Sequence, residues 1–364
     1  MWVGVFPALS QTGGVQQVGR HVGAVLAKRA RERGVPCELL GLNDARGAGS
    51  FKVGAQEYAF TGFGRGKISL LLFLFRRLPR IEILYLGHVN LAPIGLLLRS
   101  FRPSLQYCVV THGVEVWEPL SFFRRMALRR AQRVMAVSVY TANALVKAQK
   151  VSPENVFVVY PALDPGFARE PRDRTSLPFP TRGRMLLTVG RLISSEPGKG
   201  VELVIQALTE VMKIVPDIFY VVVGEGDLQP RLEELARENS VSDRVVFSGP
   251  GGLEQLKSYY SRADIYVMPS RQEGFGIVFL EAMLFGKPVI GGAYGGSPEI
   301  VQDGVTGFSV RPGDLETLTA RLIQLLQDEA LRVRMGSAAR RRVEDNFTFE
   351  HFEDGLTRML DAPP

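Results

Sequence analysis

Short apolar segments alternate with segments of helical length along most of the chain. In the first half, runs rich in β-branched and aromatic residues are separated by helical segments such as 15–33, 122–131 and 141–149. The strands expected in this half are 2–6, 37–42, 83–86, 107–111, 134–137 and 156–160. Such alternation predicts parallel sheets that are covered by helices on both faces.

The second half starts the same pattern again. Its expected strands are 185–189, 218–223, 244–247, 265–268, 288–290 and 308–310. The segment between the halves is rich in proline, which indicates a linker. We therefore predict an α/β protein with two doubly wound, Rossmann-like domains that face a central cleft. The first covers residues 1–165, the linker 166–183 and the second domain 184–345.

Composition is consistent with two globular domains. The chain has 364 residues, of which 46% are hydrophobic, enough for two sizeable cores. Cys37 and Cys108 lie in apolar segments, so we expect reduced core thiols and no disulfide. We expect the first residues to form a strand and expect no signal peptide. The apolar segments 68–75 and 91–98 are shorter than the roughly 20 residues of a spanning helix. We expect a cytoplasmic protein, either soluble or peripherally attached to the inner face of the cytoplasmic membrane.

Charge is distributed unevenly. Residues 1–180 contain 24 basic and 11 acidic residues, a net charge of +13, whereas the remainder has 20 and 26, a net charge of −6. Within the basic half, Phe122–Arg130 predicts a cationic amphipathic helix, and residues 66–80 form an apolar stretch flanked by charge. Such segments can rest on an anionic membrane surface, or they can pack on the sheet with their arginines in water. Nucleic-acid binding is disfavoured, because the arginines are not interleaved with stacking aromatic residues.

Small and charged residues follow several of the expected strands. Ligands of doubly wound sheets bind beyond the carboxyl ends of the strands. The candidates at these positions are Gly13-Gly14, His112-Gly113, Gly190-Arg191, Lys199-Gly200 and Gly224-Glu225-Gly226. Each alone is ambiguous, since a glycine pair can be only a turn, a loop cation can be solvated and a histidine can be structural. Together, two cations and several helix N-termini suit a diphosphate.

The segment RQEGFGIVFLEAM, residues 271–283, contains two glutamates. This segment follows the expected strand 265–268 and leads into a helix that ends near Gly286. Glu273 is therefore expected on the strand-to-helix turn, and Glu281 just over one turn into the helix. Gly274 and Gly276 would allow a ligand to approach the backbone. Two carboxylates at such an opening suit the hydroxyl groups of a sugar.

In combination, these motifs resemble those of the retaining family 4 glycosyltransferases of the GT-B fold. The specific motifs are EGFGIVFLE from Glu273, VGRL around Arg191, Lys199-Gly200 and the later GGSPEIVQDGVTG. Looser matches in the rest of the chain are Gly13-Gly14, THG at 111–113, AVS at 136–138 and NFTFEHF at 346–352. The resemblance implies that a last helix, at about 346–364, crosses back to the first domain. We expect one helix over 345–361, anchored by Phe347, Phe349 and Phe352.

The resemblance also implies a role for each candidate residue. Arg191 and Lys199 would neutralise the donor diphosphate and stabilise the departing nucleotide. Glu273 would accept a hydrogen bond from the donor sugar, and His112 would lie near the reacting sugar; these four are the expected catalytic residues. Glu281 would hold the ribose hydroxyls. The remaining expected donor-binding residues are Gly13, Gly14, Glu225, Gly274, Phe275, Gly276 and Ile277.

By resemblance, the reaction transfers a hexose with retention of configuration to a glycan or lipid-linked acceptor in polysaccharide or glycolipid synthesis. Mannose from a GDP-hexose and glucose from a UDP-hexose both remain open. The acceptor-reading loops, expected around 62–66 and 87–93, match no pattern that we can interpret. The chain has no Asp-x-Asp motif and no cysteines at metal-ligand spacing, so we predict metal-independent catalysis without a cofactor.

Other functions remain open at this point. A nucleotide-sugar epimerase of related fold is the nearest enzymatic alternative, and a non-catalytic nucleotide- or membrane-binding protein is an alternative of another class. Two glutamates also occur in glycosidases, but the glycines and cations around them suit a nucleotide better. A nicotinamide dehydrogenase is disfavoured, because the first strand-to-helix turn contains TGGVQQVG and no complete Gly-x-Gly-x-x-Gly.

Overall fold

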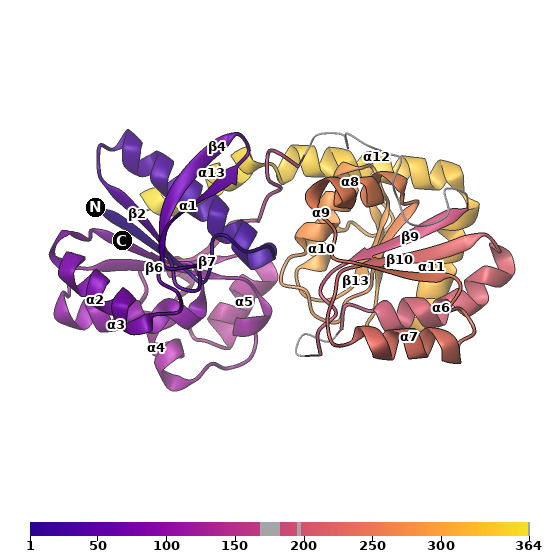
Figure 1. Ribbon diagram of the computed structural model, residues 1–364, viewed down its shortest axis with the longest axis horizontal. Coiled ribbons are helices and arrows are strands. Elements are labelled where there is room, and N and C mark those ends of the chain that lie inside the picture. Colours follow the sequence, from indigo (N-terminus) through magenta and orange to yellow (C-terminus); the bar gives the residue numbers. More distant parts are fainter. Residues whose placement is uncertain (168–182, 195–197, 363–364) are drawn as a thin grey trace. The chain divides into compact units, whose positions relative to one another are not determined.

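The computed structural model describes residues 1–167, 183–194 and 198–362, and the chain forms two compact units (Figure 1). The first unit is Met1–Phe167 with Phe347–Pro364, and the second is Ala168–Asn346. Most of the segment that we predicted as a linker, residues 168–182, lies outside the described residues. Each unit is built around one sheet, so the predicted α/β class is confirmed.

The first unit has an eight-stranded sheet in the order β3-β4-β2-β1-β5-β6-β7-β8. Its strands are β1 Trp2–Phe6, β2 Cys37–Gly41, β3 Gly47–Val53, β4 Gln56–Gly62, β5 Ile83–Leu86, β6 Gln106–Thr111, β7 Arg133–Ala136 and β8 Val156–Val158. The strand order reverses at β1, which pairs in parallel with both β2 and β5.

Our expectation of purely parallel pairing was wrong for β3 and β4, which form an antiparallel hairpin. The chain turns at Gly54, whose φ of +58° favours glycine. Phe51, Val53 and Phe60 point inward and are buried, while polar residues alternate with them. This period-two pattern is typical of a strand with one face in solvent.

Helices cover both faces of the first sheet. They are α1 Gly14–Glu32, α2 Lys67–Arg77, α3 Ala92–Phe101, α4 Phe122–Arg130, α5 Val139–Lys147 and α13 Phe349–Asp361, with short 3₁₀ turns η1 Leu78–Arg80, η2 Val89–Leu91, η3 Val114–Val116 and η4 Pro153–Asn155. Leu74 of α2, Leu98 of α3 and Leu128 of α4 share one core with Val3 and Val5 of β1. These helices therefore lie on one face of the sheet.

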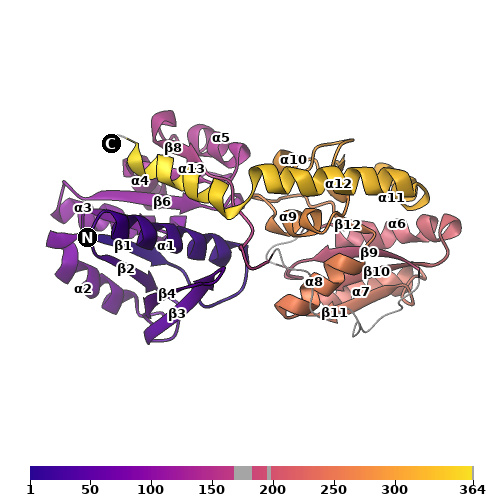
Figure 2. The ribbon, with the colours of Figure 1, turned by 90° about the horizontal axis from the view of Figure 1, so that it is seen from above.

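α1 packs on the opposite face, and α13 lies beside it (Figure 2). The rings of Phe349 and Phe352 contact His21 of α1 edge to face, at centroid distances of 5.1 and 5.6 Å. The prediction of one helix over 345–361 was wrong: α12 ends at Asn346, and α13 begins at Phe349. Phe347 lies in the break and is buried, so an apolar contact fixes the point where the chain enters the first unit.

The second unit has a six-stranded sheet in the order β11-β10-β9-β12-β13-β14, with all of these strands parallel. Its strands are β9 Arg184–Val189, β10 Ile218–Val223, β11 Val245–Gly249, β12 Ile265–Met268, β13 Val289–Gly292 and β14 Gly307–Val310. Its helices are α6 Val201–Ile214, α7 Gln229–Glu238, α8 Leu253–Arg262, α9 Ile277–Leu284, α10 Ser297–Ile300, α11 Leu315–Gln327 and α12 Glu329–Asn346.

Helix α6 illustrates why these segments fold as they do. Val201, Val204, Ile205, Leu208 and Val211 recur at helical spacing and are all buried. They form one apolar stripe against the sheet, and the remaining positions are largely polar. Burying a side chain of this size contributes roughly 1.5–3 kcal/mol, so the stripe fixes the helix on the sheet.

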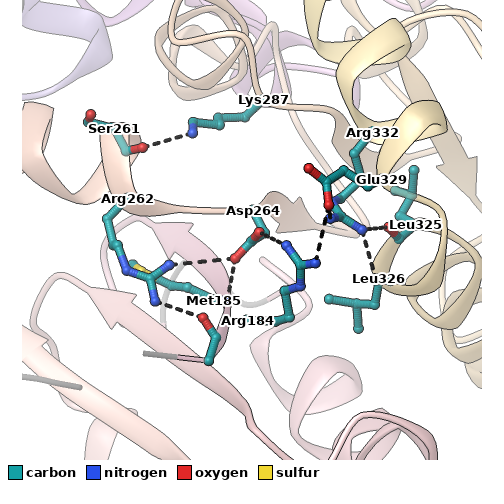
Figure 3. Close-up of polar contacts among 11 residues, drawn as sticks. Arg184, Met185, Ser261, Arg262, Asp264, Lys287, Leu325, Leu326, Glu329 and Arg332 are labelled. Carbon is teal, nitrogen blue, oxygen red and sulfur yellow. Dashed lines mark hydrogen bonds and ion pairs between the residues drawn. The ribbon is translucent and has the colours of Figure 1, made fainter. Parts of the chain in front are cut away.

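A network of charged residues lies at the amino ends of the strands in the second unit (Figure 3). Asp264, just before β12, accepts hydrogen bonds from the Met185 amide at 2.8 Å and from Arg184 Nη1 at 3.0 Å. Arg262 donates to the Gly183 carbonyl, and Arg332 donates to two carbonyls at the end of α11. Because ligands of such sheets bind at the carboxyl ends, this network stabilises the fold and is remote from the expected site.

Candidate functional site

The topology of the second unit defines where a ligand should bind. The strand order reverses between β9 and β12, so the loops that follow these two strands diverge at the carboxyl edge. Arg191 and Lys199 lie in the loop after β9, and Glu273 lies in the loop after β12. A small pocket opens beside the first loop. It is lined by Arg191, Leu192, Gly198, Lys199, Val201, Glu202, Leu228 and Leu232.

Lys199 and Glu273 form an ion pair at this edge, with Lys199 Nζ 2.8 Å from Glu273 Oε2. The pair is partly shielded from solvent, since the side chains are 25% and 15% exposed. The two loops are held together, because the Arg271 amide donates to the Gly198 carbonyl at 2.7 Å. Gly200 caps α6 with φ of +79°, and a Cβ there would lie 2.6 Å from the Pro269 carbonyl oxygen. This close approach explains the glycine after Lys199.

The EGFG segment forms a compact turn into α9. Gly276 precedes the helix with φ of +101°, a conformation that favours glycine. The Gly296 amide donates to the Glu273 carbonyl at 2.8 Å, and a Cβ on Gly296 would lie 2.3 Å from the Gly274 carbonyl oxygen. Gly274, Phe275 and Gly276 are buried. In the first turn of α9, the Phe279 amide donates to the Gly276 carbonyl at 2.9 Å, whereas the amides of Ile277 and Val278 have no acceptor within the helix.

Glu281 lies in α9 and is buried. The Tyr260 hydroxyl donates a hydrogen bond to Glu281 Oε2 at 2.6 Å. Burial raises the pKa of Glu281 to about 7, because a charged carboxylate is disfavoured away from water. Its ionisation therefore changes in the physiological range.

Glu225 is fixed through its backbone. Its carbonyl accepts a hydrogen bond from the Leu192 amide at 2.9 Å, and its side chain is exposed. Gly224 and Gly226 beside it have φ of +140° and +156°. Glu225 thus follows β10 next to the loop that carries Arg191.

The remaining candidates belong to the first unit. Gly13 and Gly14 open α1 directly after the β1 loop, and Gly13 has φ of +131°. Asp44 holds this loop, because its carboxylate accepts from the amides of Leu9 at 2.8 Å and Ser10 at 2.9 Å. A carboxylate from the segment after β2 therefore holds the loop that leads into α1.

His112 follows β6 and is held at three points. Its amide donates to Glu115 Oε1 at 2.6 Å, its Nε2 lies 2.9 Å from the Gly87 carbonyl, and its ring stacks on His88 at 5.5 Å. The contact with the carbonyl assigns the proton of neutral His112 to Nε2, which leaves Nδ1 as an acceptor.

His88 is a candidate that our sequence analysis missed. It follows β5 by two residues, within the loop expected to read the acceptor. Its Nδ1 accepts from the Asn90 amide at 3.0 Å. Burial, and then the neighbouring His112, lower the pKa of His88 to about 4. His88 is therefore neutral at pH 7. The missed signal was its position, since His88 and His112 both follow buried strands of one sheet.

The structure thus brings Arg191, Lys199 and Glu273 to one edge of the second sheet, with Glu281 behind them in α9. Gly13, Gly14 and His112 belong to the first unit. Among the described residues, no cluster of three or more His, Cys, Asp or Glu side chains could hold a metal ion. Both cysteines are free. In the part of the chain that is described, no helix is long and apolar enough to span a bilayer.

Comparison with known proteins identifies the family. Residues 169–342 match the family model for glycosyl transferases group 1, and residues 14–167 match that for glycosyltransferase family 4. The GDP-mannose-dependent alpha-(1-6)-phosphatidylinositol monomannoside mannosyltransferase of Mycolicibacterium smegmatis is 33% identical over 299 residues, covering 77% of this chain and 76% of the relative. The GDP-mannose-dependent monoacylated alpha-(1-6)-phosphatidylinositol monomannoside mannosyltransferase of Corynebacterium glutamicum is 30% identical over 292 residues, or 75% of each chain.

Solved structures agree in fold. Sucrose-phosphate synthase from Thermosynechococcus elongatus superposes with a TM-score of 0.77 at 22% identity, covering 98% of each chain. The Anabaena protein HepE, solved in complex with UDP, superposes with a TM-score of 0.76 at 19% identity, covering 99% of each chain. The predicted GT-B fold and the resemblance of the motifs are both confirmed. This chain belongs to the family 4 glycosyltransferases.

Proposed function

We propose that this protein transfers mannose from GDP-mannose to an inositol-containing glycolipid, with retention of the anomeric configuration. The observation that carries this proposal is the Lys199–Glu273 pair beside Arg191, at the point where the strand order reverses. It offers cations for a diphosphate and a carboxylate for a sugar. The choice of mannose and of the acceptor is supported by the relatives at 33% and 30% identity, whose names specify GDP-mannose and phosphatidylinositol monomannosides.

In the proposed donor site, Arg191 and Lys199 bind the diphosphate of GDP-mannose. Negative charge develops on the leaving GDP as the bond from C1 to the phosphate oxygen breaks, and fixed cations stabilise that charge. The described hydrogen bonds of the Glu273 side chain use Oε2 only, so Oε1 can accept from a mannose hydroxyl. The amides of Phe275, Gly276 and Ile277 would stabilise bound anionic groups at the start of α9.

In the proposed reaction, the acceptor hydroxyl attacks C1 from the face that GDP leaves. A bond forms between the acceptor oxygen and C1, the bond from C1 to the phosphate oxygen breaks, and the hydroxyl proton passes to an oxygen of the departing diphosphate. His112 binds near the reacting sugar through Nδ1, and the amides of Gly13 and Gly14 meet the phosphates from the first unit. We propose that no metal is required, because Arg191 and Lys199 neutralise the charge.

We also propose that the protein docks peripherally on the inner face of the cytoplasmic membrane. The docking face consists of the outward sides of α2, α3 and α4, which lie beside one another in the first unit (Figure 1). Phe75 of α2 contacts Phe101 of α3 at 5.1 Å, and Arg99 of α3 donates to the Arg130 carbonyl at the end of α4. The three helices therefore form one continuous surface.

The docking face combines exposed apolar side chains with positive charge. Phe122 and Phe123 are 65% and 67% exposed. Further exposed apolar residues are Ile68, Leu72, Leu97 and Phe101. The three helices contain no acidic residue and eight basic ones, which are Lys67, Arg76, Arg77, Arg99, Arg124, Arg125, Arg129 and Arg130. Apolar insertion with surrounding cations suits anionic phospholipid, where each cation near the surface contributes about 1 kcal/mol.

An enzymatic assay tests the proposed function. Purified protein is incubated with GDP-mannose, or with UDP-glucose, and vesicles containing phosphatidylinositol monomannoside, and the lipids are analysed by mass spectrometry. We expect a lipid product heavier by one hexose, formed with GDP-mannose and absent with Lys199→Ala. An epimerised nucleotide sugar, or release of free sugar without any lipid product, would contradict the proposal.

A further inference from the structure

Tyr260 and Glu281 form a buried hydrogen-bonded pair in the second unit. The Tyr260 side chain, on α8, is completely buried, and its hydroxyl lies 2.6 Å from Glu281 Oε2. Among the described residues, the hydrogen bonds of the Glu281 carboxylate use this oxygen only. One carboxylate oxygen is therefore occupied by the protein, and Oε1 can accept from a ligand.

Aromatic packing fixes the position of the Tyr260 hydroxyl. The Tyr260 ring stacks on Phe285 at 5.9 Å with an interplanar angle of 22°, and it lies 5.9 Å from the Tyr266 ring. The Tyr266 hydroxyl donates to the Val189 carbonyl at 3.3 Å, two residues before Arg191. The carboxylate of Glu281 is thus held by a buried side chain that packs against two aromatic rings.

We propose that Tyr260 is the positioning residue of the ribose site: its hydroxyl holds Oε2 of Glu281 and directs Oε1 toward a ribose hydroxyl of the donor nucleotide. This inference rests on the proposed function, in which Glu281 binds the ribose. Tyr260 does not touch the nucleotide itself. A fixed carboxylate binds a hydroxyl more tightly than a mobile one, because less rotational freedom is lost on binding.

Tyr260 also affects the pKa of Glu281. Burial raises the pKa of Glu281 to about 7, and the hydrogen bond from Tyr260 opposes this effect by stabilising the carboxylate. The pKa of Tyr260 is far above 10, so it remains a donor throughout the neutral range. Tyr266 on β12 is the second ionisable group that interacts with Glu281, and its pKa is also well above 10. The charge that changes near pH 7 is therefore that of Glu281.

The test compares GDP with 2′,3′-dideoxy-GDP by calorimetric titration of the full-length protein. Tyr260→Phe should weaken GDP binding about fivefold, because the Glu281 carboxylate loses the donor that fixes it, and leave dideoxy-GDP binding unchanged. Tyr259→Phe is the matched control, because it removes another buried tyrosine hydroxyl from α8, one that contacts Gln255. It should leave the ratio of the two affinities unchanged.

The pH dependence of the ratio of the GDP and dideoxy-GDP affinities shows whether Tyr260 positions the Glu281 carboxylate or only packs in the core. In the wild type, the preference for GDP should rise with pH through about 7, as Glu281 ionises. In Tyr260→Phe the midpoint should move to higher pH, because the carboxylate has lost a donor. In a Glu281→Gln background, Tyr260→Phe should have no further effect. Equal losses for both nucleotides, or an unchanged midpoint, would overturn the proposal.

Two outcomes separate this inference from the proposed function. If the wild type binds UDP rather than GDP, the proposed donor is wrong, and the same comparison with UDP and its dideoxy analogue decides the role of Tyr260. If it binds neither nucleotide, both proposals fail. Should Tyr260→Phe not fold, 3-fluorotyrosine at position 260 retains the ring and donates more strongly. It should move the midpoint to lower pH, and an unchanged midpoint would again contradict the proposal.

Discussion

The two units are both built on a doubly wound sheet, to which the first unit adds the β3–β4 hairpin, and they differ in the chemistry that they present. Both have a doubly wound sheet with one reversal of strand order. The second unit carries the Lys199–Glu273 ion pair at its carboxyl edge, where the loops approach closely at glycines. The first unit carries two stacked histidines at strand ends and an exposed, basic and apolar docking face. Because fold alone does not specify function, our proposals that the second unit binds most of the donor and that the first unit binds the membrane rest on this difference.

The largest expected effect is on turnover. Glu273→Ala removes the carboxylate proposed to bind the donor sugar, and should lower kcat at least 100-fold, comparable to the loss of a well-oriented polar contact in a transition state. The measurement is the initial rate of mannosyl transfer at saturating GDP-mannose. The melting temperature serves as the control for folding. A rate within a factor of three of the wild type would remove Glu273 from the site.

The next largest effect is expected on the affinity for the diphosphate of GDP. Arg191→Ala combined with Lys199→Ala should weaken GDP binding at least 100-fold, since hydrogen bonds to charged groups contribute about 1.5–3 kcal/mol each. Guanosine, which lacks phosphate, should bind the variant and the wild type equally. Calorimetric titration measures both affinities. Equal losses for GDP and guanosine would show that the two residues do not contact phosphate.

A smaller effect, on vesicle binding, is expected when arginines of the docking face in the first unit are replaced. Replacing Arg124, Arg125, Arg129 and Arg130 by serine should lower binding to anionic vesicles at least tenfold, because each cation contributes about 1 kcal/mol at such a surface. GDP affinity should not change. The measurement is cosedimentation with vesicles at low and at high salt.

A matched variant tests whether position or net charge matters for membrane binding. Serine at Arg231, Arg237, Arg334 and Arg341, four exposed positions in the second unit, changes the net charge equally. This variant should bind vesicles like the wild type. If both variants lose binding alike, then net charge and not the docking face controls membrane association.

The smallest expected effect distinguishes the amino ends of the strands in the second unit from their carboxyl ends. Asp264→Ala breaks the network at the amino ends of the strands, where Asp264 accepts from Arg184 and the Met185 amide. It should destabilise the unit by about 1–3 kcal/mol, the cost of leaving polar groups unpaired. Melting should occur a few degrees lower, while GDP affinity at 25 °C stays unchanged. Weaker GDP binding would mean that the two edges of this sheet are coupled.

The regular part of the fold could be predicted from sequence, because buried parallel strands are continuous apolar segments. Ile83–Leu86, Ile218–Val223 and Ile265–Met268 have the bounds that were expected. The hairpin of β3 and β4 was missed, because the alternation of buried and polar residues is short and glycines occupy several positions of the two strands. Our predicted final helix was too long at its start, since the break near Phe347 depends on a tertiary contact.

Residues of the candidate site could be predicted from sequence only where a charged residue follows an expected strand and stands beside a glycine. Arg191, Lys199 and Glu273 follow strands and stand beside glycines, and the structure brings them to one edge. Tyr260 had no such signal, because a tyrosine on an amphipathic helix resembles any core residue until its partner is known. His88 did have a local signal, because it follows the buried strand β5 by two residues, but its contact with His112 could not be predicted without the order of the strands in the sheet.

The most direct test of the division between the units is a calorimetric titration of the wild-type protein with GDP, UDP and ADP in the presence of a chelator. Our account predicts that GDP binds at least tenfold more tightly than UDP or ADP, that the chelator has no effect, and that serine at the four docking-face arginines leaves the GDP affinity unchanged. No binding of GDP, equal binding of all three nucleotides, or binding that requires an added metal would contradict it.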